Sequence, residues 1–237
     1  MFRALPIIPA VLIFVACGGD SSGPTAGFEC LGQPLPTTAP PLVNLSGQVR
    51  TYTGSAISGA AVVAFRVGNA TALDSTNTNT PGNYSVGITT GGTPVDGFLR
   101  VTDGTHLPTY AYPAVPLATD VTENVLMVSS TEFGVLAAAA GITPQPGKGF
   151  VGIVVKNCQG TAIAGAKVTT SPAGEIRYSA GGLPSSTASA TDSSGVAFVA
   201  NVTAGNVTIM ATASGHTLRQ HVVNAAADAI TLTEIQP

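Results

Sequence analysis

Side chains that could carry out chemistry are few and far apart in this sequence of 237 residues. The three histidines are His106, His216 and His221, and no group of cysteines or acidic residues accompanies them. A metal site needs three or four ligands that converge on one point. We therefore interpret the histidines as turn or strand residues, and the sequence predicts no metal and no cofactor.

One hydrolase-like pattern occurs in the segment GDSSG at Gly19–Gly23, where Ser21 takes the place of the nucleophilic serine of G-x-S-x-G. Such a serine acts from a sharp turn that follows a strand and precedes a helix. The residues around Ser21 are mostly Gly, Ser, Asp and Pro, which favour turns and loops over either element. We predict no catalytic centre.

The aromatic residues are densest between Phe98 and Tyr112. Tyr110 and Tyr112 alternate, so both side chains point to one face of a strand, and His106 lies shortly before them. If that face is open, its rings could stack on sugar rings. If it is covered, the tyrosines belong to the core or to an edge. Tyr110, Tyr112 and His106 thus form a candidate ligand face.

The N-terminal residues 1–16 have the composition of a signal peptide. Arg3 precedes an apolar run, Leu5–Ala16, of about 12 residues, whereas a membrane-spanning helix needs about 20. No later segment approaches membrane-spanning length. The sequence therefore predicts export, and residues 1–16 are the predicted signal peptide.

Cys17 directly follows Phe14-Val15-Ala16 and precedes two glycines. This arrangement resembles the lipobox of bacterial lipoproteins, although Phe14 stands where that pattern prefers Leu. The resemblance implies that Cys17 is acylated, becomes the new N-terminus and anchors the chain in the lipid bilayer. Gly18 after the cysteine implies the outer membrane. An ordinary cleaved signal with an incidental cysteine is the alternative.

Two cysteines are left after lipidation, Cys30 and Cys158. Outside the cytoplasm a pair of thiols can oxidise, and a Cys30–Cys158 disulfide would join the N-terminal segment to the second half of the chain. Two independent thiols, or pairing with another chain, are the alternatives.

The composition excludes some partners and favours a fold class. Charged residues make up 9% of the chain and the net charge is −3, so no basic face for nucleic acid can form. The chain is rich in Gly, Thr, Val and Ser and has no Trp, which suits short strands joined by tight turns. Residues 17–43 are rich in Gly, Ser and Pro, and the sequence predicts a flexible tether there.

The rest of the chain contains two copies of one unit. GSAISGAAV at Gly54–Val62 matches GTAIAGAKV at Gly160–Val168, and TNTPGNYSV at Thr78–Val86 matches TDSSGVAFV at Thr191–Val199. Period-two stretches such as Asn206–Ala213 predict half-buried strands. Strand signals recur about every ten residues, as in a β-sandwich.

These motifs resemble the carboxypeptidase regulatory-like domains, whose fold is a transthyretin-like or immunoglobulin-like sandwich. The family pattern ends in an aromatic residue two positions after a turn glycine, which Tyr84 satisfies. The second copy has Ala197 there and Phe198 one position later, so we expect a bulge or a shifted register. The resemblance implies a fold and leaves the function open.

We therefore predict an all-β chain with two tandem Ig-like or transthyretin-like sandwiches, at residues 44–129 and 149–237. A short helix and linker at residues 130–148 separates them. Ser130 or Thr131 can cap the helix and Gly141 can end it.

The function hypothesis is a non-catalytic, membrane-anchored lipoprotein that acts outside the cytoplasm as a binding or structural scaffold for a protein or a carbohydrate. An accessory subunit of a cell-envelope enzyme or transport complex is the alternative, and a hydrolase with an unrecognised site is the third hypothesis. The ligand and the oligomeric state are not predicted.

Overall fold

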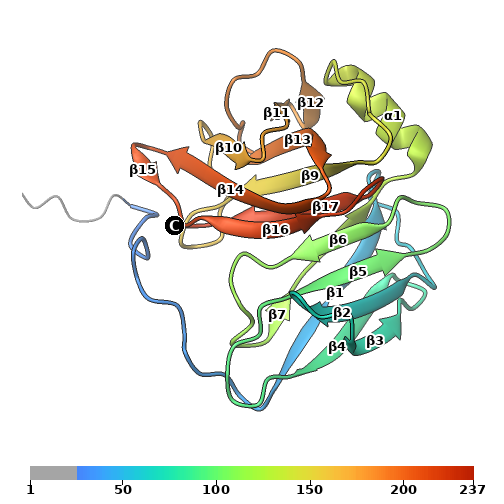
Figure 1. Ribbon diagram of the computed structural model, residues 1–237, viewed down its shortest axis with the longest axis vertical. Helices are drawn as coiled ribbons and strands as arrows, with labels where there is room; N and C mark the ends of the chain where they lie inside the picture. The colour runs from blue at the N-terminus through green and yellow to red at the C-terminus, as the bar shows by residue number, and fades with distance from the viewer. Residues whose placement is uncertain (1–25) are drawn as a thin grey trace, which may run out of the picture.

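The structure is a computed structural model that describes residues 26–237, so the expected signal peptide and Cys17 lie outside the described residues. The described chain is built from strands and one helix (Figure 1). Its buried side chains form two large clusters, one in each half. The prediction of an all-β fold with two Ig-like sandwiches is confirmed. None of the described helical structure is long and apolar enough to cross a membrane.

Domain 1 encloses the first cluster between two layers of strands. In one layer β1 pairs antiparallel with β4 and parallel with β7 and β8; the other layer has the order β6-β5-β2-β3. The strands are β1 (Leu42–Thr51), β2 (Ala61–Arg66), β3 (Ala72–Asn77), β4 (Asn83–Thr89), β5 (Gly97–Thr102), β6 (Thr109–Tyr112), β7 (Val121–Thr122) and β8 (Val125–Met127).

Domain 2 encloses the second cluster in the same way. One layer has the order β12-β11-β13-β9-β17, and in the other β14 pairs with β10, β15 and β16. The strands are β9 (Lys148–Val155), β10 (Lys167–Ser171), β11 (Glu175–Ala180), β12 (Leu183–Ser185), β13 (Val196–Thr203), β14 (Gly205–Ala213), β15 (His216–Thr217), β16 (His221–Ala225) and β17 (Ile230–Ile235).

One sheet of nine strands runs through both domains, because β17 of domain 2 pairs in parallel with β6 of domain 1. Leu232 pairs with Ala111, and both pack against the cluster of domain 1. Thr233 pairs with Tyr112, which belongs to the cluster of domain 2. The two domains therefore cover opposite faces of the same sheet. The sequence predicts two sandwiches spaced by a helix; the structure joins them by strand pairing.

The repeated motif has the same local structure in both domains. The Thr78 hydroxyl donates to the Ile57 carbonyl (2.7 Å) and accepts from the Ala60 N–H (2.9 Å). Thr191 makes the matching pair of bonds with Ile163 and Ala166, at the same two distances. A buried hydroxyl with both bonds satisfied fixes the turn that each motif encodes.

The turn glycines explain the second half of the motif. Gly82 and Gly195 have φ of +79° and +68°, a region that favours glycine. A Cβ on either would lie 2.7 or 2.6 Å from a carbonyl oxygen, that of Val49 or that of Val155. At both turns the chain passes so close to the preceding strand that a residue with a side chain would not fit.

In the second copy the bulge or register shift that we expect at Ala197 and Phe198 is absent. Ala197 is fully buried at the position equivalent to Tyr84, and pairing of β13 with β9 is regular from Val196 to Val199. The register shift lies later, between Val199 and Val202, where Asn201 has φ of +56°. No bulge is needed at Phe198, because its side chain simply points to the opposite face of the sheet from Ala197.

The helix α1 (Ser130–Ala139) follows domain 1 in the chain, as predicted, but its cap is Ser129 rather than Ser130 or Thr131. Ser129 and Glu132 form a capping box in which each side chain bonds the backbone of the other. Gly141, at φ of +65°, follows the C-cap Ala140. The helix packs through Ala137 and Ala140 against the nine-stranded sheet.

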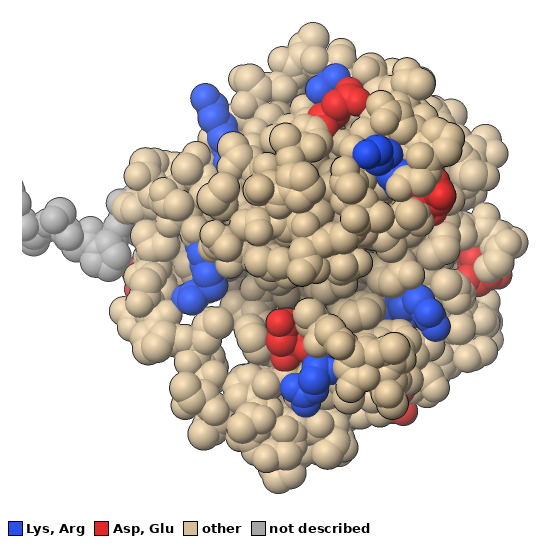
Figure 2. Space-filling model, in the orientation of Figure 1, with Lys and Arg blue, Asp and Glu red and all other residues tan. Residues whose placement is uncertain are grey.

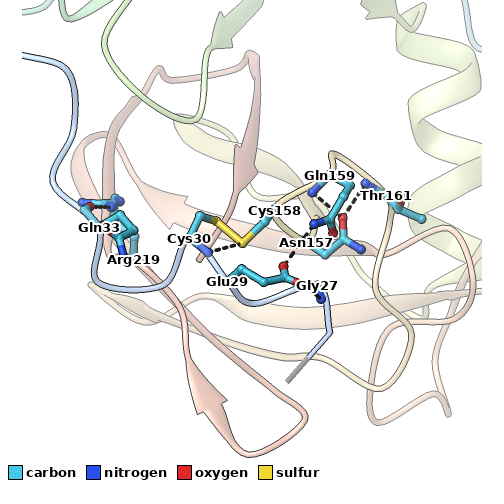
Figure 3. The surroundings of a disulfide bond; sticks show 9 residues. All are labelled: Gly27, Glu29, Cys30, Gln33, Asn157, Cys158, Gln159, Thr161 and Arg219. Carbon is cyan, nitrogen blue, oxygen red and sulfur yellow. Dashed lines mark hydrogen bonds between the residues drawn. A yellow bond between two sulfur atoms is a disulfide. The ribbon is translucent and has the colours of Figure 1, made fainter. Parts of the chain in front are cut away.

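Residues 26–41, which we name the strap, are held against the two domains, so the flexible tether predicted for residues 17–43 does not extend through them. Phe28 is 5% exposed within the cluster of domain 2, and Cys30 forms a disulfide with Cys158 (Figure 3). Arg219 Nη2 donates to the Gln33 carbonyl at 2.8 Å. The strap then reaches domain 1, where the Ala39 N–H donates to the Gly92 carbonyl.

Replacing both cysteines, Cys30→Ser with Cys158→Ser, is expected to lower the free energy of unfolding by about 2–4 kcal/mol. The disulfide closes a loop of 128 residues, so its loss gives the unfolded chain more freedom. Urea unfolding followed by circular dichroism measures the change. Wild-type protein under reducing conditions is the control and should show the same loss; an unchanged midpoint in both would contradict the role of the bond.

Candidate functional site

The predicted ligand face of Tyr110 and Tyr112 is covered in the structure. Tyr112 is 2% exposed, its ring stacks on Phe98 with centroids 4.9 Å apart, and Tyr110 is half-buried with its centroid 6.0 Å from Phe98. The alternation that places both rings on one face is present, but that face packs against domain 2. Of the two alternatives, the structure has the covered face, so these rings form no open platform for a sugar.

His106 is a turn residue and does not join the tyrosines. Its Nδ1 lies 2.5 Å from Asp103 Oδ2 and its N–H donates to Asp103 Oδ1, within the loop between β5 and β6. His221 Nδ1 lies 2.9 Å from the Thr233 hydroxyl, and burial lowers its pKa. Among the described residues no three His, Cys, Asp or Glu side chains are grouped so that they could hold a metal ion.

A cleft of ≈330 Å³, which we name the interdomain cleft, lies where the domains meet. Strands from both domains and the helix contribute to it. Its lining consists of Tyr52, Glu123, Asn124, Leu126, Val128, Phe133, Leu136, Ala137, Ala140, Phe150, Gly152, Ile153, Val154, Ser179, Gly182, Pro184, Ser194, Val196, Phe198, Ile230, Leu232, Thr233 and Glu234.

The floor of the cleft is the face of β9, β13 and β17 that is turned away from the cluster of domain 2. Phe198 pairs with Gly152, and Gly152 pairs with Leu232, so these three residues lie side by side across the sheet. A Cβ on Gly152 would lie 3.0 Å from Leu232 Cδ2. Because Gly152 has no side chain, Leu232 can lie close to the backbone of β9 at this point of the floor.

The walls come from the helix and from domain 1. Phe133 of α1 meets Phe150 of β9 edge to face, with centroids 5.1 Å apart. The same two rings line a second cavity of ≈280 Å³ beside the cleft. Domain 1 contributes Leu126 of β8, and the Tyr52 hydroxyl donates to the Gly182 carbonyl at 3.2 Å. That bond joins a turn of domain 1 to a turn of domain 2 at the cleft.

Charged groups from both domains meet at the cleft. Lys156 forms an ion pair with Glu234 in domain 2, and Glu123 of domain 1 interacts electrostatically with both. Burial raises the pKa of Glu123, the charge of Glu234 adds to this and Lys156 opposes it, and together they bring the pKa to about 7. The Tyr84 hydroxyl donates to the Glu123 carbonyl, which fixes the backbone that carries this carboxyl.

The remaining charges form no second site on the face that Figure 2 shows. Lys, Arg, Asp and Glu are scattered over both domains there, and no patch of one sign forms.

Sequence reasoning missed the cleft. A glycine inside a strand, such as Gly152, indicates that another group approaches the backbone closely. This glycine could have directed attention to the surface that forms the cleft floor. Nothing in the sequence around Glu123 distinguishes it from the other acidic residues of turns. Its neighbours at the cleft are Lys156 and Glu234, which only the folded chain brings near.

No protein-family model matches the chain, and no curated protein is similar to it in sequence. The shaft pilin SpaA from Lactobacillus rhamnosus GG is a similar solved structure, with 12% identity and a TM-score of 0.28, over 83% of this chain and 98% of that one. A streptococcal ancillary pilin has 10% identity and a TM-score of 0.27, over 83% and 62%.

A third solved structure is 3-chlorocatechol 1,2-dioxygenase from Rhodococcus opacus 1CP, with 7% identity and a TM-score of 0.29, over 39% of this chain and 61% of that one. At these TM-scores the likenesses carry no argument about function.

Glu123→Gln is expected to remove a fall in stability that wild-type protein shows between pH 4.5 and 7. The pKa of Glu123 rises from 4.5 to about 7 on folding, so the unfolded chain releases its proton first as the pH rises. The free energy of unfolding therefore falls by about 3 kcal/mol as the pH rises from 4.5 to 7. The variant cannot ionise there and should be the more stable protein above pH 7.

Urea unfolding at a series of pH values from 4 to 8 measures this difference. Asp120→Asn is the matched control, because Asp120 lies three residues earlier, is exposed and does not line the cleft. Equal stability of wild type and Glu123→Gln at pH 8 would contradict the buried position of the carboxyl.

Proposed function

We propose that this chain is a non-catalytic binding protein of the extracytoplasmic space, anchored in a membrane through acylated Cys17, that takes an apolar ligand into the interdomain cleft. The observation that carries the proposal is the cleft itself. Small-molecule sites are typically concave spaces of about 300–1,000 Å³, mostly apolar, with a few polar groups and a carboxyl of perturbed pKa. The interdomain cleft has each of these properties.

The ligand class follows from the lining. Phe150, Phe198 and Leu232 form an apolar floor, and an apolar molecule that covers it removes this surface from water. A sugar would leave its hydroxyl groups without partners over such a floor, at a cost in free energy. Apolar ligands are therefore favoured over the carbohydrate of the sequence hypothesis.

Location outside the cytoplasm is supported by two features. The Cys30–Cys158 disulfide belongs to oxidising compartments. The signal-peptide pattern before Gly18 favours export, and the lipobox pattern favours a lipid anchor at Cys17. Acyl chains give lasting attachment when two or more are present.

The neutral fluorophore N-phenyl-1-naphthylamine is expected to bind wild-type protein and to gain fluorescence, because its rings fit an apolar cleft. Gly152→Val is expected to weaken this binding about tenfold or more, because the new side chain collides with Leu232 and pushes it from the floor into the cleft. Fluorescence titration at pH 7 measures both affinities.

Val135→Ser is the control, because Val135 is 66% exposed on α1 and does not line the cleft. It should bind the fluorophore like wild type. Failure of wild-type protein to bind, or equal binding by Gly152→Val, would overturn the assignment of the cleft as a ligand site.

Mass spectrometry of the protein purified from its native membrane tests the anchor. The expected result is a mature chain that starts at Cys17 and carries acyl mass, with the peptides of Cys30 and Cys158 joined before reduction. An unacylated chain with another N-terminus would contradict membrane anchoring and leave the binding proposal to stand on the cleft.

A further inference from the structure

We propose that the ligand of the interdomain cleft is a cationic amphiphile, whose alkyl chain lies on the floor and whose ammonium group meets the carboxylate of Glu123. This inference rests on the proposed function and names the chemistry of the ligand. Three observations support it: the balance of charge at the cleft, the hydrogen bonds of Glu123, and the shape of the apolar space.

The balance of charge at the cleft is negative. Glu123 and Glu234 supply two carboxylates, and Lys156 supplies one ammonium group, which is already paired with Glu234. One carboxylate is therefore left without a cation. A ligand ammonium group would restore neutrality, whereas a ligand carboxylate would meet repulsion from both acids.

The carboxyl of Glu123 is also left without a hydrogen bond. Its backbone is fully used, since the N–H donates to the Ser46 carbonyl and the carbonyl accepts from Tyr84. Among the described residues no side chain or backbone group makes a hydrogen bond to its carboxyl oxygens. A half-buried carboxylate in this state gains from a donor that carries positive charge.

The space beside this carboxyl suits an alkyl chain. At about 30 Å³ for a group of the size of a water molecule, ≈330 Å³ holds about ten methylene-sized groups. Leu232 lies over Gly152 in the middle of the floor, and the rings of Phe150 and Phe198 lie beside it with centroids 6.0 Å apart. An alkyl chain of about ten carbons is the expected length.

Isothermal titration calorimetry at pH 8 with decylamine, decanol and decanoate tests the proposal. Decylamine is expected to bind about tenfold more tightly than decanol, and decanoate is expected to bind most weakly. Octylamine, with two methylenes fewer, is expected to bind about fifteenfold more weakly than decylamine.

Glu123→Gln separates the headgroup from the chain. It keeps the size of the side chain and is expected to bind decylamine and decanol with equal affinity, while decanol binds it as it binds wild type. Asp120→Asn, on the other side of β7 and outside the cleft, should keep the preference for the amine. This pair of variants shows whether the charge at position 123 recognises the ligand.

Proton release gives a second measurement. At pH 6.5 part of the Glu123 population is protonated, because its pKa is about 7. Binding of an ammonium group favours the ionised form, so decylamine should release protons from wild type. The heat of binding should then differ between buffers of different ionisation enthalpy, and Glu123→Gln should show no difference.

The outcomes distinguish the two proposals. Equal affinity for all three headgroups, or preference for decanoate, would overturn the cationic amphiphile and leave an apolar binding cleft. A preference for the amine that survives in Glu123→Gln would likewise overturn the assignment to Glu123. No binding of any decyl compound or of N-phenyl-1-naphthylamine would overturn both proposals.

Discussion

The parallel pairing of β17 with β6 is the interaction on which the rest of the structure depends. It joins one layer of each sandwich into a single sheet of nine strands. Domain 1 places its second layer on one face of that sheet, and domain 2 places its second layer on the other. The face of β9, β13 and β17 opposite the cluster of domain 2 is therefore left to a single helix. Because α1 covers this apolar face only in part, the interdomain cleft forms where the layer of domain 1 ends.

The strap reinforces this arrangement from outside the sheet. Domain 1 follows the strap in the chain, yet Phe28 and Cys30 attach the strap to domain 2. The disulfide closes a loop that contains all of domain 1 and the helix. Separation of the domains would therefore require loss of β17–β6 pairing while the disulfide still holds the two ends together. A cleft between domains held in this way keeps its shape without a ligand, which lowers the entropy cost of binding.

The features that depend on local sequence patterns could be predicted from the sequence. The two repeats, the strands and the short helix follow from period and turn chemistry. The pairing between domains does not follow, because alternation shows that a strand has two faces and not what covers each. Tyr110 and Tyr112 were placed correctly on one face, but the residues that pair with them, Thr231 and Thr233, lie more than a hundred positions later. For the same reason Glu123 could not be connected with Lys156 and Glu234 from the sequence.

The difference between the two copies of the repeat is what builds the candidate site. In domain 1 the motif aromatic, Tyr84, points into the core and its hydroxyl holds the backbone of Glu123. In domain 2 the equivalent position is Ala197, and the aromatic ring has moved to Phe198, which faces the cleft. One copy therefore presents a carboxyl and the other an apolar floor. The half-buried carboxyl of Glu123 accepts no hydrogen bond from the described residues, and its raised pKa lowers the stability of the fold at neutral pH. Groups with perturbed pKa values are common at binding and catalytic sites, so this carboxyl adds to the concave shape and the apolar floor as a reason to propose a binding site in the cleft.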